Sequence, residues 1–157
     1  MYRILTHNLY LLLLSPVFLS GFFAWFFAQF IKTIVEVSRG RSSKMDILAS
    51  LVWRTGGMPS SHSALATALT TALGFTEGLG SPFFVFTFFY GVLIIRDALG
   101  VRRAAGNQAH AINQLAEEMN NKIGTQIKPV KEVHGHTPAE VFIGCLLGFF
   151  IAVAFCI

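Results

Sequence analysis

The chain has 157 residues, of which 54% are hydrophobic and only 13% are charged, and its mean hydropathy is +0.60. This composition excludes an ordinary soluble domain and indicates an integral membrane protein. In so apolar a chain, the net charge of +4 favours contact with anionic lipid headgroups and argues against nucleic acid as a partner.

Four apolar segments predict four transmembrane helices in one domain that covers residues 1–157. The middle two segments, 63–74 and 82–95, reach the spanning length of about 20 residues only when their polar ends are included. With those ends, the four predicted spans are 9–31, 59–77, 81–99 and 141–157. The predicted fold class is therefore all-α, a polytopic membrane helix bundle. Ser15-Pro16 is expected to start or kink the first helix.

The two long loops carry amphipathic sequence of their own. Residues 43–53 are typical of a short helix at the membrane interface. From 101 to about 120, apolar residues recur on one face of a longer helix, which Asn120-Asn121 and Gly124 should end. Residues 128–132 then form a connector back to the membrane.

Basic residues are distributed unevenly between the two sides of the predicted bundle. Eleven of the twelve lysines and arginines fall beyond the apolar cores of the first and third helices, in or beside the two loops that follow them, and only Arg3 falls on the other side. The positive-inside rule therefore places both loops in the cytoplasm and both termini outside. The eleven are Lys32, Arg39, Arg41, Lys44, Arg54, Arg96, Arg102, Arg103, Lys122, Lys128 and Lys131.

The sequence Gly57-Met58-Pro59-Ser60-Ser61-His62-Ser63 opens the second apolar helix. Pro59 and Ser60 are typical of a helix start, where unpaired backbone N–H groups attract anions. His62 should then lie about one turn into the helix, beside a bound anion. A second histidine cluster, residues 134–140, opens the last apolar segment in the same way. Two helix starts that each carry a histidine indicate a site for a phosphate group.

Three linked stretches resemble the divergent branch of the type 2 phosphatidic acid phosphatase family, which is related to acid phosphatases and vanadium haloperoxidases. They are residues 56–64, 96–106 and 135–141, and they occur in the order found in that family. Lys32 and Arg39 match the spacing of its first motif, and residues 59–62 match Pro-Ser-Gly-His with serine in place of glycine. His136 and Glu140 match the end of the third motif, with glutamate in place of aspartate.

The resemblance implies a metal-independent phosphatase without a cofactor, which hydrolyses a membrane lipid phosphate. The positive-inside rule places its active site on the cytoplasmic side of the plasma or inner membrane. His136 would attack phosphorus, with Glu140 accepting its ring N–H, and His62 would act as acid and then as base. The phosphate-binding residues would be Lys32, Arg39, Ser60, Ser61 and either Arg102 or Arg103. One of these last two arginines would replace the Ser-Arg pair of the family motif, since Pro129 and Val130 stand there.

Other interpretations stay open at this stage. Asp97 is either part of the site or a structural counter-ion to Arg102 or Arg103. The same polar residues could line a small transporter, and the missing Ser-Arg pair is also consistent with a catalytically inactive membrane scaffold. A metal site built from His62, His134, His136 and Asp97 is a weaker alternative.

Overall fold

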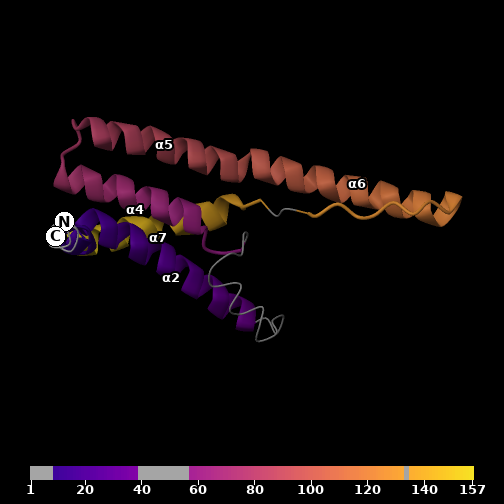
Figure 1. The fold of residues 1–157 in the computed structure, drawn as a ribbon, viewed down its shortest axis with the longest axis horizontal. Helices are drawn as coiled ribbons and strands as arrows, with labels where there is room; N and C mark the ends of the chain where they lie inside the picture. The colour runs from indigo at the N-terminus through magenta and orange to yellow at the C-terminus, as the bar shows by residue number, and fades with distance from the viewer. Residues whose placement is uncertain (1–8, 39–56, 133–134) are drawn as a thin grey trace.

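The computed structural model describes residues 9–38, 57–132 and 135–157, and the helices in it confirm the all-α class (Figure 1). The predicted interfacial helix 43–53 lies outside the described residues. The principal helices are α2 (Pro16–Ser38), α4 (Ser61–Thr76), α5 (Pro82–Leu99), α6 (Val101–Ile123) and α7 (Pro138–Cys156).

The first predicted span is displaced along the chain. Residues 9–14 are helical, but the helix breaks at Ser15, and α2 begins at Pro16, whose fixed φ suits a first helical position. The helix then continues beyond residue 31 to Ser38. The prediction that Lys32 lies in a loop is therefore wrong. Lys32 lies within α2, where the rest of the bundle leaves it only 1% exposed.

Three of the described helical stretches are long and apolar enough to cross a membrane: Pro16–Val35, Pro82–Ile123 and Pro138–Cys156. The remaining predicted span forms α4, which has only 16 residues. Its length of about 24 Å is less than the 30 Å of a typical hydrocarbon core. α4 packs against α2, α5 and α7, and it is thus the central helix of the bundle (Figure 1).

The closest helix contact in the described bundle is between α4 and α7, and two glycines permit it. A Cβ on Gly148 would lie 2.1 Å from the carbonyl oxygen of Ala64, and one on Gly144 would lie 2.5 Å from that of Ser60. These glycines are four residues apart and so lie on one face of α7, as in the small-residue motifs by which membrane helices associate. Their contact holds the start of α7 beside the start of α4.

α6 continues the line of α5 and extends away from the other helices (Figure 1). Helical backbone hydrogen bonds continue across the junction between α5 and α6. The Gly100 N–H donates to the Arg96 carbonyl and the Ala104 N–H donates to the Gly100 carbonyl, each at 2.9 Å. α6 ends where Gly124 adopts a φ of 75°. The following segment returns alongside α6, and the Asn113 side chain bonds both the N–H and the carbonyl of Val130 at 2.7 and 2.9 Å. The predicted amphipathic helix and connector are both confirmed.

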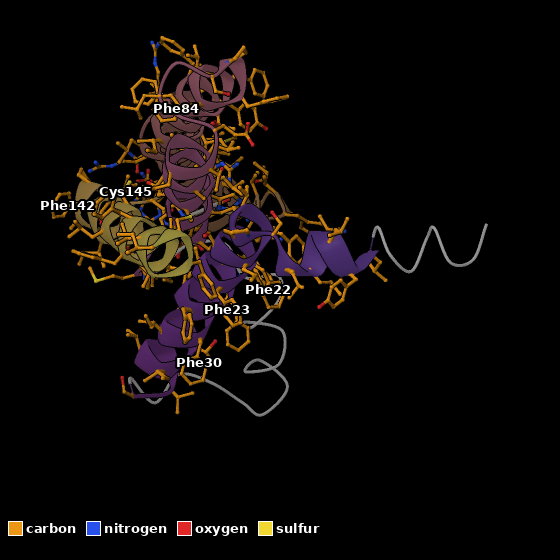
Figure 2. All side chains as sticks on the ribbon, turned by 90° about the vertical axis from the view of Figure 1, so that its left-hand side faces the viewer. Phe22, Phe23, Phe30, Phe84, Phe142 and Cys145 are labelled. Carbon is orange, nitrogen blue, oxygen red and sulfur yellow. The ribbon has the colours of Figure 1, made fainter. Side chains whose placement is uncertain are left out.

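Large apolar side chains cover the outside of the bundle. Phe22 and Phe30 on α2 and Phe142 on α7 lie along its outer faces (Figure 2). They are 47%, 45% and 63% exposed. Side chains of this kind on the surface of apolar helices are typical of contact with lipid.

Candidate active site

The predicted site residues that the structure describes gather at one end of the bundle, where α4 and α7 begin and α5 ends. Lys32 comes from α2, His62 from α4, and His136 from the residues just before α7. Arg102 lies in the first turn of α6. The charges of Lys32 and Arg102 act on the rings of both histidines, so four separate parts of the chain contribute to one polar cluster.

The Glu140 carboxylate fixes the position of His136. Nδ1 of His136 lies 3.1 Å from Oε2 of Glu140, and the two side chains are only 4% and 17% exposed. The expected contact between the two residues is present, although the pair does not share a helical face, because His136 precedes the helix. Thr137 is the N-cap, and the same Oε2 also accepts the Thr137 N–H at 3.1 Å.

This arrangement sets the tautomer of His136. A carboxylate only accepts hydrogen bonds, so Nδ1 carries the proton and Nε2 keeps its lone pair. The backbone N–H of His136 donates to the carbonyl of Ala98 at 3.3 Å, which ties the residue to the end of α5 as well. His136 is therefore held through its backbone by Ala98 and through its ring by Glu140, and these contacts do not use Nε2.

Burial keeps the His136 ring neutral. The pKa of His136 is lowered from its usual value near 6.5, chiefly because burial disfavours the charged ring. The hydrogen bond and negative charge of Glu140 raise the pKa, whereas the positive charges of Lys32 and Arg102 lower it further. At neutral pH the imidazole is thus unprotonated, which is the form that can act as a nucleophile.

Ser60 starts α4 as predicted. It is the N-cap: its Oγ accepts the Ser63 N–H at 3.4 Å and the Ser63 hydroxyl at 3.0 Å. Its own backbone N–H donates to the Glu140 carbonyl at 3.0 Å, which joins the starts of α4 and α7. Ser60 and Ser61 are both buried, at 0% and 4% exposure, while His62 is exposed. The hydroxyl of Ser60 is thus engaged in capping the helix.

Gly57 connects this motif to Lys32. Its φ of 87° is in the left-handed region that favours glycine. A Cβ there would lie 3.4 Å from Cγ of Lys32, so the loop before α4 passes directly over the lysine stem. The lysine is thereby enclosed between α2 and the Pro-Ser-Ser-His motif.

Of the two candidate arginines, Arg102 is the one whose charge acts on both histidines. Its Nε donates to Oδ2 of Asp97 at 2.7 Å, so Asp97 is the counter-ion of Arg102, and its charge also acts on His62. Arg103 has an exposed side chain. Its backbone instead contacts Gly135, where a Cβ would lie 2.4 Å from the Arg103 Cα.

Two predicted residues cannot be placed, and two contacts at the site were not predicted from the sequence. Arg39 and His134 lie outside the described residues. Among those that the structure does describe, no group of three histidine, cysteine or acidic side chains is arranged to hold a metal ion. Sequence reasoning did not predict the hydrogen bond to the Ala98 carbonyl or the close approach of Arg103 to Gly135. The sequence signal for that approach was the glycine between His134 and His136.

Comparison with known proteins places the chain in a family. Residues 13–151 match the sequence profile of the Divergent PAP2 family. The chain belongs to the Divergent PAP2 family. It is 41% identical over 144 residues to the "uncharacterized membrane protein YuiD" of Bacillus subtilis (strain 168), an alignment that covers 85% of this chain and 89% of that protein. No solved structure gives a significant match.

Membership of the Divergent PAP2 family confirms the predicted resemblance. Together with the apolar helices, it identifies the chain as a multi-pass membrane protein. The family profile includes every described residue of the polar cluster, from Lys32 to Glu140.

Proposed function

We propose that this protein is a membrane phosphatase that hydrolyses the phosphomonoester of a lipid through a phosphohistidine intermediate. The observation that carries the proposal is the buried His136, whose Nδ1 is bound by Glu140 while the charges of Lys32 and Arg102 act on its ring. A neutral imidazole with a free Nε2 beside two cations is suited to attack a phosphate and to stabilise the charge that develops on it.

The reaction has two steps. The lone pair of His136 Nε2 forms a bond to phosphorus as the ester P–O bond breaks, and His62 donates a proton to the departing alkoxide. His62 then takes a proton from water, whose oxygen attacks phosphorus as the P–N bond breaks. Inorganic phosphate leaves, and both histidines return to their starting states.

Cationic side chains and hydroxyl groups of the site bind the phosphate group in this mechanism. Lys32 and Arg102 bind the non-bridging oxygens, with Asp97 orienting Arg102 through the contact at 2.7 Å. The first turn of α4 adds backbone donors and the Ser61 hydroxyl, since the first N–H groups of a helix have no partner within it. Arg39 belongs to the same proposal through its motif spacing. With these charges the reaction needs no divalent metal.

The substrate assay tests the function directly. Purified protein with a chelator present is expected to release phosphate from phosphatidylglycerophosphate, phosphatidate or a polyprenyl phosphate, and to prefer a lipid over a soluble sugar phosphate. The preference follows from a cationic site at the end of apolar helices, where a lipid headgroup lies when its chains are in the bilayer.

Three other results would each contradict part of the proposal. Equal turnover of soluble and lipid phosphates would contradict the substrate class, and activity abolished by the chelator would contradict the metal-free mechanism. Protein that releases no phosphate from any of these lipids would instead support the inactive scaffold or the transporter.

We also propose that the site faces the cytoplasm, because the basic residues lie on the same side of the bundle as the site and the positive-inside rule places that side in the cytoplasm. Cysteines introduced at Gly80 and at Glu117, with Cys145 and Cys156 replaced by alanine, are expected to be labelled from opposite sides of the membrane. Gly80 tolerates the change because a Cβ there meets nothing within 4 Å. Labelling of residue 117 from outside intact cells would reverse the orientation.

A further inference from the structure

An apolar groove of about 560 Å³ lies between α4 and α5, bordered on one side by Phe149 of α7. Its volume is in the range of sites that hold small molecules. The Thr70 hydroxyl in its wall is already engaged, since Oγ1 lies 2.8 Å from the Ala66 carbonyl oxygen and 3.2 Å from that of Thr87. The groove therefore offers hydrocarbon contacts and few polar ones.

The groove leads to the candidate active site along both of its walls. On α4, His62, Ala66, Thr70 and Gly74 follow one another at intervals of four and so form one stripe. The last three line the groove, and the first is the exposed histidine of the site. On the other wall, Ile95 lines the groove two helical turns before Arg102, along the continuous line of α5 and α6.

Its depth corresponds to one leaflet of a bilayer. The α5 wall runs from Ile95, nearest the site, to Phe84 at the far end. Eleven residues of helix rise by about 16 Å, which is about half of the 30 Å hydrocarbon core. A lipid whose phosphate lies among the cations would place its chain beside this wall over the whole thickness of its own leaflet.

Small residues create the space. Gly91 is buried in the wall, and a Cβ there would lie 3.6 Å from Thr70 Oγ1 and 3.7 Å from the Ala66 Cβ, in van der Waals contact with both. Any larger side chain at Gly91 would project into the groove. Ala66 and Gly74 have the same effect on the α4 side.

From these observations we infer that the α4–α5 groove binds one hydrocarbon chain of the phosphorylated lipid whose phosphate occupies the candidate active site. This inference rests on the proposed function and adds to it the part of the protein that selects for a chain. The site end supplies the positive charge that a phosphate requires, and the groove supplies an apolar surface continuous with it.

Two neighbouring positions on α5 provide a matched test. Val92 lines the groove, whereas Leu93 is 61% exposed and does not line it. Val92→Trp is expected to lower kcat/KM for dipalmitoyl phosphatidate by about tenfold, because burial of only a few methylenes is lost. It should leave nitrophenyl phosphate turnover unchanged, and Leu93→Trp should change neither. An equal loss on both substrates, or the same loss in Leu93→Trp, would overturn the inference.

A binding experiment separates this inference from the proposed function. Phosphatidate with a diazirine at the middle of one chain is expected to label peptides of α4 and α5, and unlabelled phosphatidate should compete while phosphatidylcholine should not. Competed labelling that is lost in Val92→Trp, in a protein that releases no phosphate, would keep the groove and refute the phosphatase. Hydrolysis accompanied by labelling that no lipid competes, or that persists in Val92→Trp, would refute the groove alone.

Discussion

His136→Ala is expected to form no phosphoenzyme and to lose lipid phosphatase activity by about 10⁴-fold or more, as when an enzyme loses its nucleophile. The buried ring, which the Glu140 carboxylate contacts, is the nucleophile in the proposed mechanism, and alanine leaves nothing in its place. The measurement is acid-labile, base-stable phosphate trapped on the protein. Phosphate still trapped on His136→Ala would transfer the role of nucleophile to another residue, with His134 the next candidate.

His62→Ala is the matched control, because it removes a histidine from the same cluster without removing the nucleophile. It should slow both steps by about 10²–10⁴-fold on a lipid substrate. A nitrophenyl phosphate needs no proton on its leaving group, so with it the first step should recover while hydrolysis stays slow. The phosphoenzyme should then accumulate on His62→Ala and be absent from His136→Ala.

The pH dependence of phosphoenzyme formation tests the role of Glu140. The lowered pKa of His136 predicts that the rate falls only as the pH drops below the usual value near 6.5, where the ring becomes protonated. Glu140→Gln removes the negative charge that raises this pKa, so the fall should move to still lower pH, with a smaller maximal rate. Glutamine can still complete the capping box, so the helix start is preserved. A shift toward higher pH would contradict the assigned contact.

Gly148→Val is expected to destabilise the protein by about 3 kcal/mol, at the upper end of the cost of overpacking. Its Cβ would meet the Ala64 carbonyl at 2.1 Å, and a backbone group cannot rotate away as a side chain can. α7 would have to move from α4, which would separate His136 from His62 and abolish activity. Thermal unfolding in detergent, with lipid phosphatase activity beside it, measures both effects.

Gly80→Val controls for the loss of glycine itself, because a Cβ at Gly80 has nothing within 4 Å. Its melting temperature should stay close to that of the natural protein. If Gly148→Val and Gly80→Val melted at the same temperature, the α4–α7 contact would not be a determinant of stability.

The amino-acid sequence by itself determined the features that depend on near neighbours in the chain. Ser60 and Thr137 begin their helices as serine and threonine caps, and Gly124 ends α6 in the left-handed region, since these patterns act within a single turn. The contact of His136 with Glu140 was equally local. The caps and this contact were predictable because each joins residues within about one turn of a helix end.

Only the tertiary structure decided which distant residues share the site. The sequence could not choose between Arg102 and Arg103, because adjacent residues on a helix point in different directions and only packing shows which one reaches the histidines. Lys32 was expected in a loop at the membrane surface, but it is part of α2 and other parts of the protein bury it. The α4–α5 groove likewise has no signature in the sequence of either helix alone. Such features arise where separate helices meet, and the glycines that set those distances become informative only once their neighbours across the interface are known.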